Sequence, residues 1–285
     1  MLVVLGADGM LGSALVAQAR EREIHCLPIP HTADFDAERF LLPTSLTKIL
    51  PGTRATFVNC VAAKRGSPES SLMKINAQFP CRMSRWCSDR GFRWLQVSTN
   101  GVFAGRPEPY GEEDTPDAED SYGRSKREGE TRGPGTICLR CSFVGLRLSD
   151  PSGGGGLLSW LLGQTEGASI PGHMEPPWTG ATSLQVADLI LGLLGQGDWS
   201  PFPILHFAPL RPVSKAKLLE AACEAFHKPC TITPVSNPLE KPRMLASTRI
   251  STLTIPPFAS DPAIALRELA DWIKKNHNPK EPAMP

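Results

Sequence analysis

The sequence predicts an α/β protein built on a doubly wound parallel sheet. Short apolar runs alternate with helical stretches through the first 140 residues, and a glycine-rich turn directly follows the first apolar run. Strands buried on both faces of a parallel sheet are continuous apolar runs, because crossover helices cover both faces. Ligands of such sheets bind at the carboxyl ends of the strands, so we expect a site there.

The expected elements follow from apolar runs and their flanking residues. We expect strands over residues 2–5, 24–29, 55–60, 94–98 and 136–140, and helices over 11–20, 37–49, 69–89, 122–131, 184–194, 214–227 and 262–276. Pro80 should kink or split the helix that contains it. Asp261 as N-cap and Pro262 at the first helical position should open the last helix.

Composition points to a small-molecule partner. The chain has 285 residues and a net charge of +1, which gives no electrostatic reason for a nucleic-acid or anionic-membrane partner. Apolar runs such as 189–194 are far shorter than the roughly 20 residues that span a bilayer. We therefore expect a soluble, cytoplasmic protein without a signal peptide.

The eight cysteines fit a reducing compartment. Cys138 and Cys141 form a C-x-x-C pattern within an expected strand, where positions three apart face opposite sides. No second ligand pair has matching spacing, so we expect no metal site.

The glycine-rich turn predicts dinucleotide binding. Gly6, Gly9 and Gly12 stand three apart between an apolar strand and a helix. Glycines let the backbone approach a pyrophosphate, and free amides at the helix start attract its charge. The expected contacts of this turn are Gly6, Asp8, Gly9, Met10, Leu11 and Gly12.

Two further features bear on which dinucleotide binds. Asp34 could meet the adenine while Phe35 packs beside it, or Asp34 is an ordinary loop acid. The second strand ends at Ile29-Pro30-His31 without the acid that normally binds the ribose 2′-hydroxyl of NAD, and also without an arginine for a 2′-phosphate. We favour NADPH, with NADH as the alternative.

A tyrosine–lysine pair predicts proton-transfer chemistry. Tyr122, one of two tyrosines, stands four residues before Lys126, so both lie on one helix face. A nearby cation favours the phenolate and should lower the tyrosine pKa toward neutrality. The alternative is a solvated helix with no special role.

Hydroxyls at the end of the fourth strand complete the expected site. Thr99 can hydrogen-bond a substrate carbonyl, with Ser98 on the opposite face, although such pairs also form ordinary turns. Trp178 could stack on a sugar or base, or pack in the core. Lys64 and Arg65 could meet a diphosphate, or be a solvated pair.

We expect three parts along the chain. A dinucleotide-binding domain of the Rossmann type covers residues 1–145, with a return over about 181–208. A substrate-binding lobe covers 146–180 and about 209–260, where the glycine run 153–156 and prolines at 171, 176 and 177 mark loops. Residues 261–285 form a helix and a frayed tail.

These motifs together resemble the extended short-chain dehydrogenase/reductase family, in particular its branch of dTDP-4-dehydrorhamnose reductases and related sugar-nucleotide reductases. The resemblance runs through residues 6–12, 58–63, 75–77, 98–103, 122–130, 139–145 and 178–184. Departures are Leu5 for a usual Thr, Asn100-Gly101 for an acid and an aromatic residue, and Cys141 for a common Thr. The second departure leaves the sugar open.

The resemblance implies a role for each of these positions. It makes Thr99, Tyr122 and Lys126 the catalytic triad, places Ala62 and Ala63 along the cofactor, and sets the stretch from Cys141 to Val144 beside the nicotinamide, with Cys141 and Phe143 as contacts. Ser98 joins the cofactor contacts, and Val102 and Phe103 join Lys64 and Trp178 as expected substrate contacts.

The implied function is NAD(P)H-dependent reduction of a nucleotide-linked 4-keto-6-deoxy sugar in polysaccharide or deoxysugar biosynthesis. A homodimer is compatible with the resemblance. Two alternatives stay open: an epimerase or dehydratase on the same scaffold, and a non-catalytic NADP-binding regulatory subunit similar to the beta subunit of methionine adenosyltransferase.

Overall fold

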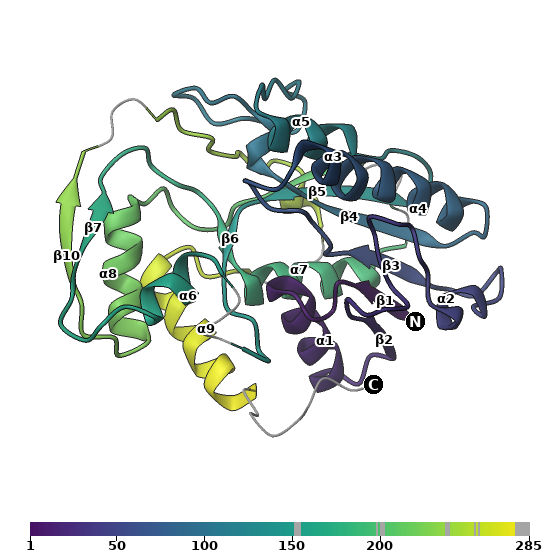
Figure 1. Ribbon diagram of the computed structural model, residues 1–285, viewed down its shortest axis with the longest axis horizontal. Coiled ribbons are helices and arrows are strands. Elements are labelled where there is room, and N and C mark those ends of the chain that lie inside the picture. The colour runs from purple at the N-terminus through teal and green to yellow at the C-terminus, as the bar shows by residue number, and fades with distance from the viewer. Residues whose placement is uncertain are drawn as a thin grey trace.

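The centre of the molecule is a six-stranded parallel sheet, seen in a computed structural model that describes residues 1–150, 155–197, 199, 203–236, 240–253, 255 and 257–276 (Figure 1). The strand order is β2-β1-β3-β4-β5-β9. These strands are β1 (Leu2–Leu5), β2 (Cys26–Ile29), β3 (Thr56–Asn59), β4 (Arg93–Thr99), β5 (Thr136–Cys141) and β9 (Ile204–Phe207). The prediction of a doubly wound parallel sheet is confirmed.

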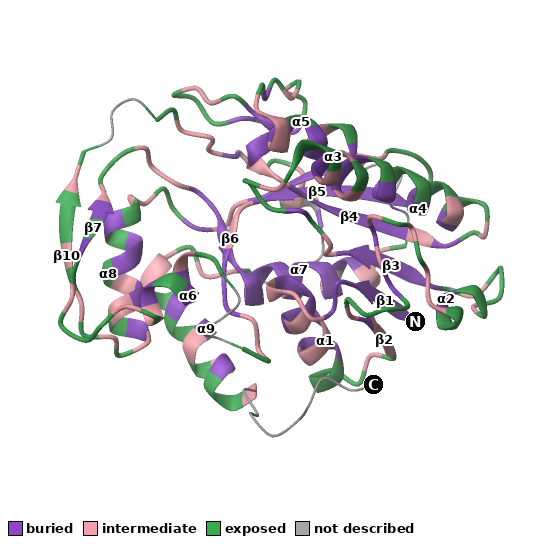
Figure 2. Cartoon of the chain, in the orientation of Figure 1, coloured by how far each residue is buried: buried purple, intermediate pink, exposed green. Residues whose placement is uncertain are grey.

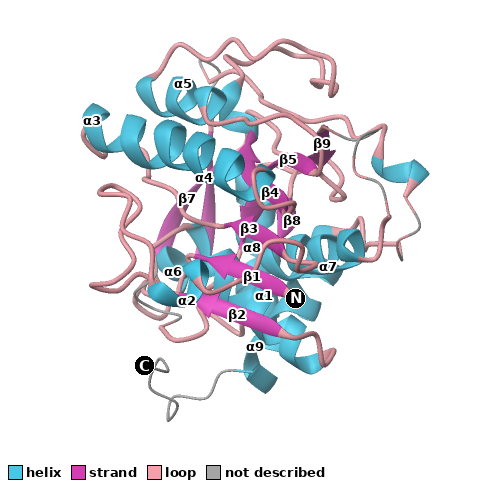
Figure 3. Cartoon of the chain, turned by 90° about the vertical axis from the view of Figure 1, so that its right-hand side faces the viewer, coloured by secondary structure: helices cyan, strands magenta, loops and turns pink. Residues whose placement is uncertain are grey.

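Helices cover both faces of this sheet (Figure 3). The described helices are α1 (Met10–Glu21), α2 (Thr44–Thr47), α3 (Glu69–Leu72), α4 (Phe79–Ser88), α5 (Ser121–Glu128), α6 (Leu157–Leu162), α7 (Ser183–Leu194), α8 (Lys215–Ala225) and α9 (Pro262–Asn276). A π-helical turn, Met73–Gln78, and two short 3₁₀ turns, Asn100–Val102 and Ile250–Thr252, complete the set.

Alternation along the strands divides the interior into two cores. In β1, Leu2 and Val4 join the core beneath α1 and α7, whereas Val3 and Leu5 join the core beneath α4. Successive strand residues point to opposite faces, and here both faces are covered. Figure 2 shows the result as a sheet that is buried along most of its length.

The expected helix over residues 37–49 is wrong, since only α2 forms there. Leu42 precedes Pro43, and the residue before a proline is disfavoured in the α region. Phe40 has a φ of +57°, and Asp36 and Leu41 exchange backbone hydrogen bonds as an antiparallel bridge. A looped segment therefore takes the place of most of the helix.

Pro80 does not split its helix, because a π-helical turn joins α3 to α4. Pro80 has no N–H to donate to the carbonyl of Asn76, four residues earlier. That carbonyl faces Gly129, where an added Cβ would lie only 1.8 Å from the Asn76 oxygen. The wider turn and the glycine let this helix press closely against the segment after α5.

A third core lies beside the sheet, among α6, α8 and α9. A two-stranded parallel sheet of β7 (Ser169–His173) and β10 (Thr231–Val235) covers its outer side (Figure 1). Two further strands, β6 (Phe143–Val144) and β8 (Ala181–Thr182), pair near the central sheet. We call the α6, α8, α9, β7 and β10 part the lobe.

The lobe is tied back to the start of the chain. The carboxylate of Glu21, the last residue of α1, accepts hydrogen bonds from Trp272 Nε1 (3.1 Å), Lys275 Nζ (2.9 Å) and Asn276 Nδ2 (3.2 Å) of α9. The expected frayed tail beyond this helix and part of the glycine run, residues 153 and 154, lie outside the described residues. None of the described helices combines the length and apolarity that a membrane crossing requires.

Candidate active site

Two adjoining cavities open at the carboxyl edge of the sheet. The nucleotide cavity, about 540 Å³, runs along the glycine turn and the ends of the strands. The outer cavity, about 340 Å³, lies toward the segments around Trp178 and Arg243. Lys64, Thr99 and Tyr122 line both cavities, so these side chains stand at the junction.

Backbone makes up the floor of the nucleotide cavity at the glycine turn. Gly6, with a φ of +75°, and Gly9 line it together with Asp8, Met10 and Leu11. Gly9 precedes α1, and its side of the turn presents free helix-start amides suited to an anion.

Gly12 differs from the other two glycines, since it lies beneath the turn and does not line the cavity. A Cβ there would meet the Gly6 carbonyl oxygen at 2.0 Å. The expected cofactor contact at Gly12 is therefore replaced by a packing role, in which the helix and the first strand come unusually close.

At the end of β2, the structure separates Phe35 from Asp34. Phe35 lines the nucleotide cavity and packs edge-on against Phe79, whereas Asp34 is exposed and does not line it. Asp8 Oδ1 accepts a hydrogen bond from His31 N at 3.0 Å, which holds the glycine turn against β2. Sequence reasoning thus placed one of this pair correctly beside the cavity.

The end of β3 supplies Cys60, Val61 and Ala62 to the nucleotide cavity. Ala63 does not line it, because its backbone is turned away and exchanges hydrogen bonds with the Asn76 side chain at 2.9 and 3.1 Å. This amide bridge fixes the loop after β3 to the π-helical turn.

Thr99 and Ser98 face different surroundings at the end of β4. Thr99 Oγ1 lies at the junction and accepts a hydrogen bond from Gly101 N at 3.0 Å. Ser98 is buried, and its Oγ donates to Glu130 Oε1 at 2.8 Å, although the residue borders the nucleotide cavity. Only Thr99 can therefore present its hydroxyl to both cavities.

Helix α5, which carries Tyr122 and Lys126, is locked at both ends. Asp120 caps it by accepting from Gly123 N at 2.9 Å, and Gly123 approaches so closely that a Cβ would lie 2.4 Å from the Gly101 carbonyl oxygen. After the helix, Glu130 forms a buried, two-pronged ion pair with Arg140 of β5, at 2.7 and 2.8 Å. Such charge-assisted pairs fix geometry tightly.

Lys126 lies almost fully buried beside the nucleotide cavity. Its Nζ donates to the Val97 carbonyl oxygen at 2.8 Å, and burial lowers the pKa of Lys126. An ammonium group has three donors, so two remain for a ligand.

Tyr122 departs from the electrostatic expectation. Burial raises the pKa of Tyr122, opposed by a hydrogen bond with Thr99 and by the charge of Arg65. The expectation that Lys126 alone would lower this pKa is wrong for the structure, since desolvation is the larger effect and Lys126 is directed at the Val97 carbonyl.

The last residue of β5 and the residues after it form the far wall of the nucleotide cavity. Cys141, Ser142 and Phe143 line it, and burial raises the pKa of Cys141 to about 12, so its thiol is protonated. Ser142 Oγ accepts a hydrogen bond from Trp178 Nε1 at 2.8 Å. Trp178 lines the outer cavity and is fixed against the nucleotide cavity by this bond.

Two expected substrate contacts lie elsewhere. The side chains of Val102 and Phe103 are fully buried in a small core with Tyr110 and Leu245, and line neither cavity. They follow the strand-end motif closely, but the short turn after Thr99 directs them inward. Phe103 contributes through its carbonyl oxygen, which accepts from Arg243 Nε at 2.7 Å.

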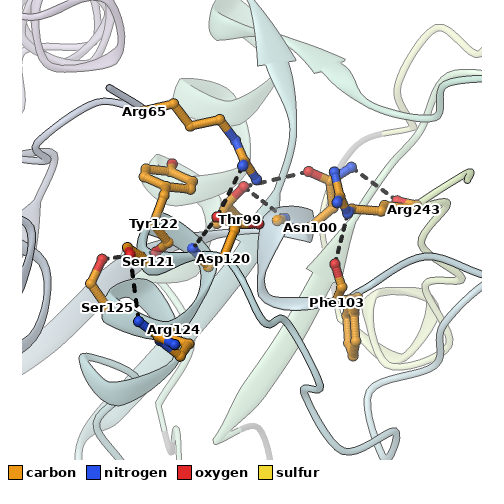
Figure 4. Close-up of polar contacts among 12 residues, drawn as sticks. Arg65, Thr99, Asn100, Phe103, Asp120, Ser121, Tyr122, Arg124, Ser125 and Arg243 are labelled. Carbon is orange, nitrogen blue, oxygen red and sulfur yellow. Dashed lines mark hydrogen bonds and ion pairs between the residues drawn. The ribbon is translucent and has the colours of Figure 1, made fainter. Parts of the chain in front are cut away.

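Several cavity residues were not foreseen from the sequence. The outer cavity also contains Asn100, Glu175, Lys215, Glu240, Lys241 and Arg243. Figure 4 shows Arg243 beside Asn100, whose Nδ2 donates to the Arg243 carbonyl oxygen at 2.9 Å. Apart from Asn100, which follows Thr99 within the strand-end motif, these residues come from segments distant in sequence and carry no local motif, so only the fold brings them together.

Arg147 is the unforeseen residue of the nucleotide cavity. It lines this cavity near Met10, Gly155 and Gly156, and its Nε is buried without a hydrogen-bond partner in the described structure. A buried donor without a partner is costly, so this nitrogen fits an anionic ligand group at the start of α1.

Within the described ranges, no group of three or more His, Cys, Asp or Glu side chains could hold an ion. All eight cysteines are free, and burial raises the pKa of Cys138 well above its ordinary value.

Comparison with known proteins identifies the family. The model of the RmlD substrate binding domain matches residues 1–144, about half of the chain. The chain belongs to this family. A probable low-salt glycan biosynthesis reductase of Haloferax volcanii is 27% identical over 270 residues, which cover 88% of this chain and 89% of that protein.

Other relatives match the family over shorter stretches. The dTDP-4-keto-6-deoxy-D-glucose reductase of Streptomyces niveus is 32% identical over 45% of each chain. The methionine adenosyltransferase 2 subunit beta of Danio rerio is 29% identical over 50% of this chain and 47% of that protein. The chain thus matches about half the length of these two proteins.

Solved structures share the whole fold of the family. A dTDP-4-dehydrorhamnose reductase from Clostridium acetobutylicum has a TM-score of 0.78 at 19% identity, over 96% of this chain and 99% of the other. A dTDP-4-dehydrorhamnose reductase from Bacillus anthracis in complex with NADP has a TM-score of 0.73 at 17% identity, over 94% and 97%. At such identities the likeness concerns the fold.

Proposed function

We propose that this protein is an NADPH-dependent reductase of a nucleotide-linked 4-keto-6-deoxy sugar. One observation carries the proposal: Thr99 and Tyr122 stand where a nucleotide cavity and an outer cavity meet. A ketone held at this junction faces a hydroxyl, a phenol and the cofactor side at once. Reductases among the relatives and the NADP-bound neighbour of the same fold support this assignment.

Each residue around the junction has a separate role in the proposed reduction. Bound NADPH supplies the hydride that adds to the carbonyl carbon. Tyr122 gives its phenolic proton to the carbonyl oxygen, which becomes the product hydroxyl, and Thr99 hydrogen-bonds that oxygen beforehand. Lys126 has two ammonium donors left beyond the Val97 carbonyl, and they hold the cofactor ribose and stabilise the phenolate left behind.

The cofactor contacts follow from the cavity lining. Gly6, Gly9 and the start of α1 present backbone to the diphosphate, and the Arg147 guanidinium lies beside the same cavity. Ala62, Phe35, Cys141 and Phe143 supply apolar wall. Asp8 is the one carboxylate that lines this cavity among the residues that the structure describes, and it already accepts from His31 N, which favours NADPH over NADH.

The outer cavity suits an anionic substrate. Lys64, Arg65, Lys215, Lys241 and Arg243 line it against two carboxylates, Glu175 and Glu240. A nucleoside diphosphate matches this excess of positive charge, and Trp178 offers a flat face to a sugar or base. The free cysteines fit a reducing compartment, so we propose that the enzyme acts in the cytoplasm. We also propose that it assembles as a homodimer.

A cofactor-oxidation screen tests the proposal. The full chain is incubated with NADPH or NADH and a panel of 4-keto-6-deoxy sugars linked to dTDP or UDP, followed by product analysis. We expect oxidation of NADPH and a single deoxysugar epimer at carbon 4. Free sugars and simple ketones serve as control substrates.

Two outcomes would redirect the assignment. Conversion of the sugar without net NADPH oxidation would favour an epimerase or dehydratase on this scaffold. Binding of NADPH without turnover of any substrate would favour a regulatory subunit. The similarity to the methionine adenosyltransferase 2 subunit beta of Danio rerio is the reason for this alternative.

A further inference from the structure

Tyr122 borders two cavities, and each of them contains a cation that the other lacks. Lys126 lines the nucleotide cavity but not the outer one, and Arg65 lines the outer cavity but not the nucleotide one. Tyr122 borders both. The guanidinium carbon of Arg65 lies 4.8 Å from the centroid of the Tyr122 ring, within the range of a cation–π contact.

The position of Arg65 is fixed by the helix that carries the tyrosine. Its Nη1 pairs with Asp120 Oδ1 at 2.9 Å, and the same carboxylate caps α5 through Gly123 N. Figure 4 shows Arg65 reaching over Tyr122 to Asp120. Any movement of α5 therefore carries Arg65 and Tyr122 together.

Gly101 leaves room for this arrangement. A Cβ at Gly101 would lie 3.2 Å from Arg65 Nη2 and 3.4 Å from the Tyr122 ring. The guanidinium and the phenol ring thus both lie against the backbone at Gly101.

We propose that Arg65 is a positioning residue that stabilises the anionic form of Tyr122 from the outer-cavity side. The second cation is useful because burial disfavours the phenolate, and Lys126 shares its charge with the Val97 carbonyl. The negative charge of Asp120 offsets part of the positive charge of Arg65, but the ion pair between them holds the guanidinium in place. The participation of Tyr122 in proton transfer rests on the proposed function, whereas its ionisation can be measured without any turnover.

The size of the effect follows from distance and exposure. A cation at about 5 Å would shift ionisation strongly in a dry interior, but the Arg65 side chain is 51% exposed and water screens it. We expect a roughly threefold to tenfold change in the ionisation constant of Tyr122. Among the described residues, Cys141 and Asp120 also act electrostatically on Tyr122, and the cations Lys126, Lys64 and Arg243 line the cavities that it borders.

The chain offers a direct readout, because it holds only two tyrosines. Full-length protein labelled with ¹³C at the tyrosine ζ carbon gives two signals, which shift as each phenol ionises. Tyr110→Phe assigns them and leaves Tyr122 as the single signal. Tyr110 stacks on Phe103 in a separate small core and loses one hydrogen bond, from Gly105 N, in this variant.

In that background, Arg65→Gln should raise the pKa of Tyr122, since removing a cation disfavours the phenolate. Arg65→Met, which retains the aliphatic stem, should do the same, and Arg65→Lys should give a smaller shift. Arg124→Gln is the matched control. Arg124 lies on α5, the helix that carries Tyr122, but it pairs with Glu69 and lines neither cavity. It should leave the titration unchanged.

The proposal is overturned if folded Arg65→Gln or Arg65→Met titrates Tyr122 as the parent does, or if Arg124→Gln gives an equal shift. Should one neutral variant fail to fold, as judged by circular dichroism, the other decides. Once a substrate is known, the same substitution should move the pH profile of kcat in the same direction. A titration shift without any turnover would support the role of Arg65 while counting against the proposed reductase.

Discussion

The two cavities that meet at Tyr122 are built in opposite ways. The nucleotide cavity is formed largely by backbone and small side chains at the ends of neighbouring strands, with Gly6 and Gly9 at its base. The outer cavity is formed by long charged side chains from segments far apart in the sequence, such as Lys64 and Arg243. We therefore expect ligand binding to depend mainly on shape in the nucleotide cavity and mainly on charge in the outer cavity.

This difference predicts how each cavity should respond to amino-acid substitution. At Gly6 and Gly12 an added Cβ would lie 3.2 Å and 2.0 Å from main-chain atoms, and a main chain cannot rotate away as a side chain can. A cavity lined by solvated charges loses affinity in smaller steps, since each contact is screened and its neighbours adjust. Substitutions in each cavity, and removal of the nucleotide from the substrate, can test this difference between a backbone-lined and a charge-lined cavity.

Gly12→Ala should destabilise the fold strongly. Its Cβ would lie 2.0 Å from the Gly6 carbonyl oxygen and 2.9 Å from Ala7 Cα, both parts of the main chain. We expect a loss of at least ~3 kcal/mol in the free energy of unfolding, measured by urea denaturation. Gly197→Ala is the control, since nothing lies within 4 Å of an added Cβ there. Equal stability of the two variants would refute the view that the glycine turn beneath the nucleotide cavity is rigid.

Removing the nucleotide from the substrate should lower kcat/KM by about a thousandfold or more, if the outer cavity grips the diphosphate. Steady-state NADPH oxidation with a nucleotide-linked keto sugar and the matching free sugar measures this ratio. Comparable rates on both would show that the charges of the outer cavity do not serve substrate binding, and would point to a general carbonyl reductase.

Tyr122→Phe should lower kcat by roughly a hundredfold or more, the usual effect of losing a positioned general acid. The affinity for NADPH should stay nearly unchanged, because the ring remains at the junction of the two cavities. Calorimetric titration with NADPH, combined with steady-state kinetics, separates the two quantities. Full activity of this variant would remove Tyr122 from the proposed chemistry.

Arg147→Met should weaken NADPH binding about tenfold, through the loss of one charge-assisted contact at the start of α1. Its matched partner is Arg243→Met, which removes a cation from the outer cavity. That variant should raise KM for the sugar nucleotide and leave the dissociation constant of NADPH unchanged. The same shift in both variants, in calorimetry and kinetics, would erase the division between the cavities.

The sequence predicted the nucleotide half well, because its signals are local. The apolar run before Gly6, the hydroxyl of Thr99 at a strand end and the four-residue spacing of Tyr122 and Lys126 all depend on neighbours in the chain. Such patterns survive folding unchanged. Helix 37–49 failed for a local reason as well, since Pro43 stops the preceding residue from entering the α region.

The outer cavity could not be predicted in this way. Lys215 and Arg243 have no motif around them, and the fold alone brings them beside Thr99. Strands β7 and β10 contain Pro171 and Pro234, residues typical of loops, so their pairing was not visible either. Arg147 was missed because a single arginine in a loop carries no period.

The three bonds between Glu21 and α9 span 251 to 255 residues of the chain. During synthesis, the nucleotide half emerges early, while the helix that completes the lobe core through Leu266 and Leu269 is made last. The sheet can therefore assemble around the glycine turn long before the outer cavity has its supporting lobe. We therefore expect the proposed cofactor site to be able to form before the proposed substrate site is complete.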